Sequence, residues 1–465
     1  MERKHDTEQS KERRAYRRKR RIRNQIISYI VLVVLIIGCV AGGYYVANNV
    51  LHKSDKDNTV VNGETPTPPN DSDGDDPTLV PDEPVEPDEP TEPDEPTDVP
   101  VVEEPDPQEV LLNEMIDSYI SQMSLQDKVA ALFIVTPEQL TGVNKVTVAG
   151  KTTQSKLNEY PVGGLIYFSK NIVSYTDFKT MLEKTQEMSK YPMFLCIDEE
   201  GGSVARVAST VSTVNDTDHM SVIGATGEPA NAAAAYTYIG SYLSDLGINV
   251  NFAPVSDVKT SINTLFDKRA FGSDPSLVSN FVSMSVIALQ EQKISACVKH
   301  FPGHGATDGD SETGMATTQR TLEEMRTAEF LPFVAGMDAG SDFVMVGHIS
   351  TPAVTGDQVP ASLSKTWITD VLRNELGYEE IIITDALNMP AITDYYLPGD
   401  AAILALQAGA DMLLMPENFV DAYNAVLNAV AQGTVTEQRI DESLRRIYRV
   451  KCQQKMITEL GEIAE

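Results

Sequence analysis

The sequence predicts an α/β fold, a (β/α)8 barrel, preceded by a transmembrane helix and a disordered, acidic, proline-rich linker. Three observations lead to this prediction. An uncharged apolar segment lies near the N-terminus, at 26–47. A tract dominated by proline, aspartate and glutamate follows it, at 55–106. From about residue 109 onward, short β-branched runs alternate with amphipathic helical stretches, which is the pattern of βα units around a parallel sheet.

The N-terminal region predicts a single-pass membrane protein. Residues 1–24 form a basic segment, and residues 25–48 form the expected anchor, since about 20 apolar residues cross a hydrocarbon core of roughly 30 Å. The basic flank places the N-terminus in the cytoplasm and the remainder outside a bacterial cell. Two alternatives stay open: a cleaved signal peptide, or lipidation at Cys39.

Residues 49–108 predict a spacer rather than a folded domain. The repeat DEPVEPDEPTEPDEPTDVP offers almost no apolar side chains to bury, so the tract is expected to be disordered and extended. The chain as a whole has a formal net charge of −31. Such an acidic balance argues against nucleic acid as a partner of the folded part.

The barrel domain is expected over residues 109–465. The β-branched runs provide eight strand candidates, at 131–137, 163–168, 193–200, 248–255, 295–301, 343–349, 380–386 and 411–417. Clear helices are predicted between several of them, at 230–246, 321–339 and 398–408. Gly409 follows the last of these helices as a stop signal.

Polar residues gather where the predicted strands end. In a (β/α)8 barrel the active site lies at the carboxyl ends of the strands. Carboxylates with a Lys-His pair, and with Arg206 and Arg269 nearby, suit a polyhydroxylated saccharide held by charge-assisted hydrogen bonds. Any single one of these side chains is as well explained as a helix cap. The polar strand ends are Asp198, Glu199, Glu200, Asp257, Lys299, His300, His348, Asp385 and Glu417.

Paired carboxylates are the usual apparatus for cleaving a glycosidic bond. In a retaining enzyme one carboxylate is the nucleophile and the other acts first as acid and then as base. Asp385 stands alone after the apolar run IIIT. This position makes it the candidate nucleophile.

Several strings after residue 110 closely resemble glycoside hydrolase family 3 β-N-acetylhexosaminidases. The combination of KHFPGHG with ITDALNM, in this order, is far more specific than any one short motif. The strings that carry the resemblance are DEEGGSVAR (198–206), NFAPVSDV (251–258), KRAFG (268–272), KHFPGHG (299–305), MVGHI (345–349) and ITDALNM (383–389).

The resemblance implies a role for individual residues. Asp385 matches the family nucleophile, which forms the glycosyl-enzyme intermediate. In the hexosaminidase branch the acid/base is a histidine supported by an aspartate two residues earlier. Asp310 matches that aspartate, but Glu312 stands where the histidine is expected. The positions that match substrate contacts are Asp198, Arg206, Arg269, Lys299 and His300.

Glu312 is the most informative departure from the family pattern. A glutamate can act as acid and base if burial and the neighbouring Asp310 raise its pKa. The resemblance then implies a retaining exo-β-N-acetylhexosaminidase that releases terminal N-acetylglucosamine, for example from peptidoglycan fragments, without cofactor or metal. The alternatives are a β-glucosidase, a glycoside phosphorylase, or a catalytically impaired cell-wall saccharide-binding protein.

Six further residues have less specific expectations. His304 and His348 are expected either to contact substrate or to order loops and core hydrogen bonds. Four methionines on or beside strands are expected to fill the barrel core. These are Met345, Met389, Met412 and Met415.

Overall fold

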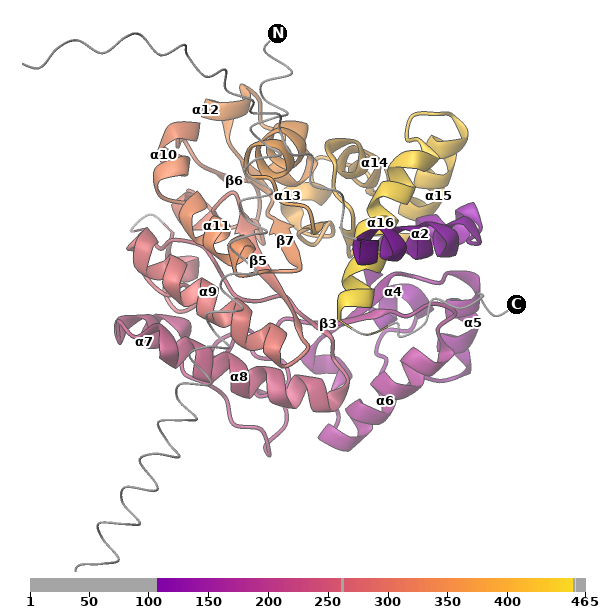
Figure 1. Cartoon of the computed structure of the whole chain (residues 1–465), viewed down its shortest axis with the longest axis horizontal. Helices are drawn as coiled ribbons and strands as arrows, with labels where there is room; N and C mark the ends of the chain where they lie inside the picture. The colour runs from indigo at the N-terminus through magenta and orange to yellow at the C-terminus, as the bar shows by residue number, and fades with distance from the viewer. Residues whose placement is uncertain (1–106, 261–262, 455, 457–465) are drawn as a thin grey trace, which may run out of the picture. The chain divides into compact units, whose positions relative to one another are not determined.

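The computed structural model describes residues 107–260, 263–454 and 456 (Figure 1). The predicted cytoplasmic segment, the predicted membrane anchor and nearly all of the predicted linker lie outside these residues. Among the helices that are described, none combines the length and the apolar composition needed to cross a bilayer.

An eight-stranded parallel sheet forms the centre of the fold, and each strand falls within one of the predicted segments. Its strand order is β10-β1-β2-β3-β4-β5-β7-β9. A parallel bridge between Ile383 and Met412 joins the two edge strands and closes the sheet into a barrel. The strands are β1 (Phe133–Val135), β2 (Gly164–Tyr167), β3 (Phe194–Ile197), β4 (Val250–Asn251), β5 (Ser295–Phe301), β7 (Phe343–Val346), β9 (Ile381–Thr384) and β10 (Leu413–Leu414).

The strands are buried along their whole length, as expected for a parallel sheet covered by helices. β9, with the sequence IIIT, shows the pattern clearly. Where β1 and β2 approach one another, Gly163 is required, because a Cβ there would lie 2.1 Å from the carbonyl oxygen of Ala131. A second, two-stranded parallel sheet, β6 (Ala316–Thr317) with β8 (Ile349–Ser350), lies outside the barrel sheet.

Helices form the outer layer around the strands (Figure 1). The N-terminal half contains α2 (Pro107–Ser121), α3 (Leu125–Ala130), α4 (Pro137–Thr141), α5 (Lys151–Glu159), α6 (Tyr175–Met188), α7 (Met220–Ala225), α8 (Pro229–Leu246) and α9 (Pro275–Glu291). The C-terminal half contains α10 (Leu322–Thr327), α11 (Phe330–Asp338), α12 (Pro352–Thr355), the π-helix η5 (Thr366–Glu375), α13 (Pro390–Thr393), α14 (Pro398–Ala408), α15 (Phe419–Ala431) and α16 (Glu437–Gln453).

The single helix predicted over 321–339 is wrong, because the chain forms two helices there, α10 and α11. Ala328 leaves the helical conformation, with φ −132° and ψ −75°. Pro332 explains the break: it has no N–H, and its ring would collide with the carbonyl of Ala328 in a continuous helix. α8 and α14 agree with the prediction, and Gly409 ends α14 with a φ of 112°.

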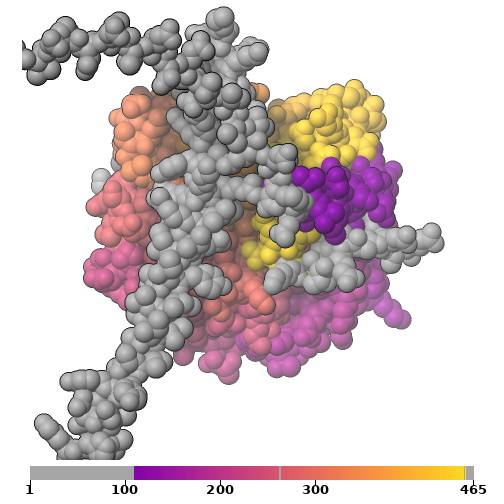
Figure 2. Space-filling view, viewed as in Figure 1, coloured from indigo at the N-terminus to yellow at the C-terminus, as the bar shows by residue number. Residues whose placement is uncertain are grey.

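The two ends of the barrel domain lie side by side, as the adjoining indigo and yellow atoms of Figure 2 show. Arg445 of α16 forms an ion pair of 2.5 Å with Asp117 of α2. Arg449 Nη2 donates to Asn113 Oδ1 one turn further along. The packing of α2 on α16 therefore joins the first and last helices of the barrel domain.

Candidate active site

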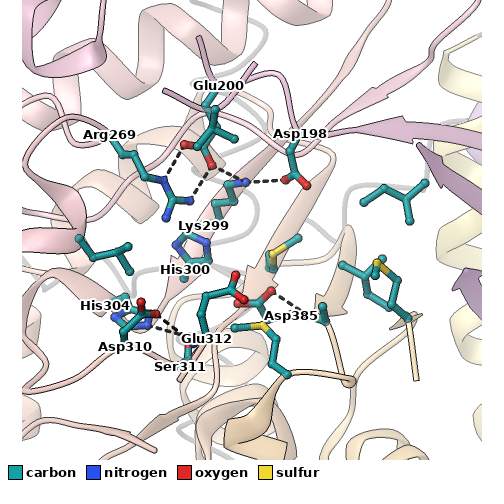
Figure 3. Close-up of a pocket in the computed structure, with 18 of the residues that line it drawn as sticks. Asp198, Glu200, Arg269, Lys299, His300, His304, Asp310, Ser311, Glu312 and Asp385 are labelled. Carbon is teal, nitrogen blue, oxygen red and sulfur yellow. Dashed lines mark hydrogen bonds and ion pairs between the residues drawn. The ribbon is translucent and has the colours of Figure 1, made fainter. Parts of the chain in front are cut away.

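A pocket of about 310 Å³ lies at the carboxyl ends of the strands (Figure 3). All of the side chains predicted to carry chemistry line it. They are Asp198, Arg206, Arg269, Lys299, His300, Asp310, Glu312 and Asp385. The structure thus brings together residues that lie far apart in the sequence, while their individual roles stay predictions.

Lys299 is the centre of a buried ion-pair network on one wall. Its Nζ lies 2.8 Å from Asp198 Oδ1 and 2.8 Å from Glu200 Oε1. Arg269 binds the same Glu200 with both Nε and Nη2, at 2.8 and 2.7 Å. Burial alone would raise the pKa of Glu200, but the Arg269 and Lys299 cations hold it well below its usual range. The network fixes the two cations in place before any ligand arrives.

Asp198 has a second cation within reach. Arg206 Nη2 lies 3.9 Å from Asp198 Oδ2, and the guanidinium stacks over the Phe168 ring at 5.4 Å. The carboxylate of Glu199 accepts the backbone N–H groups of residues 206, 207 and 208 at 2.5 to 2.9 Å. Glu199 therefore orders the loop that presents Arg206 to the pocket.

His300 is oriented by a carboxylate behind it. Its Nδ1 lies 2.8 Å from Asp257 Oδ2, and the same oxygen accepts its backbone N–H at 3.1 Å. Asp257 is fully buried. Burial opposes its ionisation, but His300 and His304 lower the pKa of Asp257 below its ordinary value. This leaves Nε2 of His300 as the ring nitrogen available to the pocket.

Asp385 follows β9 at the floor of the pocket. Its Oδ1 accepts the backbone N–H of Ala386 at 2.8 Å. Burial would raise the pKa of Asp385, yet the positive environment from His300, His348 and Lys299, together with this hydrogen bond, lowers it below its ordinary value. The carboxyl group is therefore held in its ionised form.

Glu312 reaches the pocket from the loop after β5, and Figure 3 shows its carboxylate pointing toward that of Asp385. Glu312 is exposed to solvent on one side. Its partial desolvation first, and then the charges of Asp385 and Asp310, raise the pKa of Glu312 above its ordinary value, against smaller opposing effects of His300 and Arg269. Asp310 Oδ1 accepts the backbone N–H of Glu312 at 2.9 Å. Asp310 thus stabilises the turn that carries Glu312.

The two histidines left open by the sequence differ in position. His348 is completely buried and bonds Ser362 Oγ and the carbonyl of Ala386 through its two ring nitrogens, at 2.7 and 2.9 Å. His304 lines the pocket, but both of its nitrogens also have protein partners. Both rings order backbone and loop structure.

The sequence placed Glu200 among the polar strand ends but gave it no individual role, because its two cation partners come from distant segments of the chain. Met345 and Met412 are buried in the core, as predicted. Met389 is also buried, and Met415 is partly buried and packs against the core. Met345, Met389 and Met415 in addition line the pocket. Glu417 is exposed and lies outside the residues that line this pocket.

Within residues 107–260, 263–454 and 456, no group of three His, Cys, Asp or Glu side chains has an arrangement that could hold a metal ion. Cys196 and Cys297 are buried as free thiols in the core.

Several known proteins with a similar sequence are named as β-hexosaminidases. The chain is 32% identical to beta-hexosaminidase A of Pseudoalteromonas piscicida over 324 residues, which are 63% of this chain and 54%, about half, of that protein. It is 32% identical to beta-hexosaminidase of Xanthomonas campestris pv. campestris over 270 residues, which are 57% of this chain and 81% of that protein.

A solved structure shares the architecture as well. The family 3 β-N-acetylglucosaminidase from Paenibacillus sp. superposes with a TM-score of 0.67 at 34% identity, over 72% of this chain and 63% of that one. The model of the glycosyl hydrolase family 3 N-terminal domain matches residues 122–450, which contain every strand of the barrel and every lining residue of the pocket. The chain therefore belongs to glycosyl hydrolase family 3.

Proposed function

We propose that this chain is a retaining exo-β-N-acetylhexosaminidase, with Asp385 as nucleophile and Glu312 as acid/base. The observation that carries the proposal is that the pKa values of two facing carboxyl groups are shifted in opposite directions. The surroundings of Asp385 lower its pKa, and those of Glu312 raise its pKa. Two carboxyl groups separated in this way are suited to an ionised role and a protonated role in one reaction.

The first step transfers the sugar to the protein. The ionised Asp385 attacks the anomeric carbon while the protonated Glu312 donates its proton to the leaving glycosidic oxygen, so one C–O bond forms as the other breaks. In the second step the Glu312 carboxylate takes a proton from water. That water attacks the anomeric carbon and releases the Asp385 carboxylate, with net retention of configuration.

The opposite wall of the pocket supplies donors and acceptors for the sugar hydroxyls. Lys299 and Arg269 are fixed by Glu200, so little side-chain entropy is lost when a hydroxyl binds. Asp198 offers acceptor oxygens beside them. The substrate is expected to bind through its terminal sugar, with the anomeric carbon against Asp385.

The choice of N-acetylglucosamine rests on the relatives, which are named as β-hexosaminidases and a β-N-acetylglucosaminidase. The physiological substrate that we propose is the N-acetylglucosaminyl-β-1,4-muramic acid linkage of peptidoglycan fragments. The test is proton NMR of the full-length protein with this disaccharide. Release of N-acetylglucosamine with the β anomer formed first supports the proposal, whereas the α anomer first excludes a retaining mechanism.

The replacement of the family histidine by Glu312 favours a second candidate, a saccharide-binding protein without turnover. Calorimetry with N-acetylglucosamine, alongside the NMR assay, separates the two. Binding without any product after prolonged incubation would support this second candidate. Turnover of the disaccharide would exclude it.

We further propose that residues 25–48 anchor the protein and that the linker over residues 49–108 holds the barrel outside the cell. The support is the apolar run beside the basic segment. Cell fractionation with externally added protease tests it. Membrane-bound protein whose barrel is released by the protease is expected, and a variant without residues 25–48 should leave the membrane fraction.

A further inference from the structure

We propose that His304 and Ser311 are positioning residues, whose hydrogen bond holds the loop that carries Glu312 over the pocket. The Nε2 atom of His304 lies 2.9 Å from the hydroxyl oxygen of Ser311. Ser311 lies directly between Asp310 and Glu312, and all three line the pocket (Figure 3). The inference rests on the proposed role of Glu312 as acid/base.

His304 is a fixed point on the barrel. Its backbone N–H donates to Asp257 Oδ1 at 2.6 Å, so the carboxylate that orients His300 also fixes the start of the loop. The next residue, Gly305, packs so closely that a Cβ there would lie 2.0 Å from the carbonyl oxygen of Val258. The ring of His304 therefore has little freedom to move.

The imidazole of His304 uses both of its nitrogens. Nδ1 lies 2.9 Å from Thr307 Oγ1, and Nε2 contacts Ser311. Burial and the nearby His300 lower the pKa of His304, against the opposing charge of Asp257. A neutral ring donates through one nitrogen and accepts through the other, and a hydroxyl can complement either role. The His304–Ser311 bond is therefore satisfied without a buried charge.

The segment 310–314 is otherwise a self-contained turn. The backbone N–H groups of Thr313 and Gly314 donate to the carbonyl of Asp310 at 2.9 and 3.1 Å, and the Thr313 hydroxyl donates to the same carbonyl at 3.0 Å. The Ser311 hydroxyl makes a side-chain hydrogen bond from this turn to His304 of the barrel. Ser311 itself is 2% exposed.

The His304–Ser311 hydrogen bond determines which charged groups surround the carboxyl group of Glu312. The charged groups around its carboxyl are Asp385 after β9, His300 on β5, Arg269 before α9 and Asp310 on its own turn. If the turn were released, the Glu312 carboxyl would no longer be held facing Asp385. Proton donation to a poor leaving group would then fail first, because that step depends most on a placed acid.

The test compares Ser311→Ala, Ser311→Thr and Thr313→Ala in the full-length protein. Thr313→Ala is the matched control, since it removes a hydroxyl that bonds only within the turn. Substrates are the chitobiose disaccharide, a poor leaving group, and 4-nitrophenyl N-acetyl-β-glucosaminide, a good one. The pH dependence of kcat/KM and the midpoint of thermal unfolding are measured for each variant.

We expect Ser311→Ala to lower kcat/KM for chitobiose about tenfold, which corresponds to about 1.4 kcal/mol in the barrier of the first step, with less than a twofold change in kcat/KM for the nitrophenyl substrate. The alkaline limb of its pH profile should shift to lower pH, because Glu312 then has a more ordinary pKa. Ser311→Thr should restore most of the rate, and Thr313→Ala should leave it unchanged. Thermal unfolding should be unaffected in all three.

Two results would overturn the inference. Ser311→Ala could hydrolyse chitobiose at the wild-type rate with an unshifted pH profile, or it could lose both substrates equally, as a general structural defect would. If instead the wild type is active but Glu312→Gln has no effect on chitobiose, the proposed acid/base itself is wrong. The two failures are therefore distinguishable.

Discussion

Replacing Lys451 with methionine is expected to stabilise the barrel at neutral pH. Lys451 lies on α16 with 1% of its surface exposed. Its Nζ donates to the carbonyl of Pro192 at 2.6 Å and lies over the rings of Phe194 and Tyr448, at 4.7 and 5.1 Å. Burial lowers the pKa of Lys451 from 10.5 to about 7. Folding therefore penalises the charged form of this side chain.

The magnitude follows from the shift of the pKa. A fall from 10.5 to about 7, at 1.36 kcal/mol for each pKa unit, costs roughly 4 to 5 kcal/mol of folding free energy at pH 7 and below. The unfolded lysine binds its proton up to pH 10.5, so the cost decreases as the pH rises from about 7 and vanishes above 10.5. Methionine removes this cost but leaves the Pro192 carbonyl without its donor, which costs about 1 to 3 kcal/mol.

The net gain for Lys451→Met is therefore about 2 kcal/mol at pH 7, and it should vanish or reverse at pH 10. Urea unfolding of both proteins at the two pH values measures it. Lys365→Met is the matched control, because 65% of that side chain is exposed and its effect should not change with pH. An equal difference between Lys451→Met and wild type at pH 7 and pH 10 would refute the reasoning.

Three further predictions concern the pocket. Arg269→Lys loses one of the two hydrogen bonds that the guanidinium makes to Glu200, and it should raise KM about tenfold, as measured by initial rates. An unchanged KM would mean that the two-point contact with Glu200 is not needed for substrate binding. The pH profile of kcat/KM should be broad. Its acid limb should lie below 3.8, the ordinary pKa of Asp, because the pKa of Asp385 is lowered. Its alkaline limb should lie above 4.5, the ordinary pKa of Glu, because the pKa of Glu312 is raised. A profile bounded by the two ordinary values would contradict this. Inorganic phosphate should not accelerate release of the sugar, because the ionised Glu312 and Asp310 repel an anion that approaches the glycosyl-enzyme. Formation of a sugar 1-phosphate, followed by chromatography, would instead identify a phosphorylase.

The strands could be predicted because a parallel barrel leaves a local signal. Each strand is buried on both faces, so runs such as IIIT before Asp385 are continuous and apolar. The site residues could be found for a related reason, since strand ends are visible in the sequence and all of them meet at one end of the barrel. The break between α10 and α11 also had a local cause, Pro332, which the periodicity of 321–339 obscured.

Pairings across the fold could not be predicted in this way. Glu200 binds Arg269 and Lys299, which are separated from it by 69 and 99 positions, and no spacing rule connects them. The contact of His304 with Ser311 depends on the path of a loop, which hydrophobic periodicity does not specify. Met389 and Met415 resemble core residues by type, and only the position of the strand ends places them in the pocket wall.

The central claim, that Asp385 and Glu312 share the two catalytic roles, is tested most directly by hydrolysis with the full-length wild type, Asp385→Ala and Glu312→Gln. The substrates are 4-nitrophenyl N-acetyl-β-glucosaminide and chitobiose. We predict that Asp385→Ala is inactive on both. Glu312→Gln should lose about 10²- to 10⁴-fold in kcat/KM on chitobiose while keeping kcat/KM on the nitrophenyl substrate, whose leaving group needs no proton. Its kcat on the nitrophenyl substrate should fall, because hydrolysis of the glycosyl-enzyme still needs Glu312 as base. Hydrolysis of chitobiose by Glu312→Gln at the wild-type rate, or by Asp385→Ala, would contradict the claim.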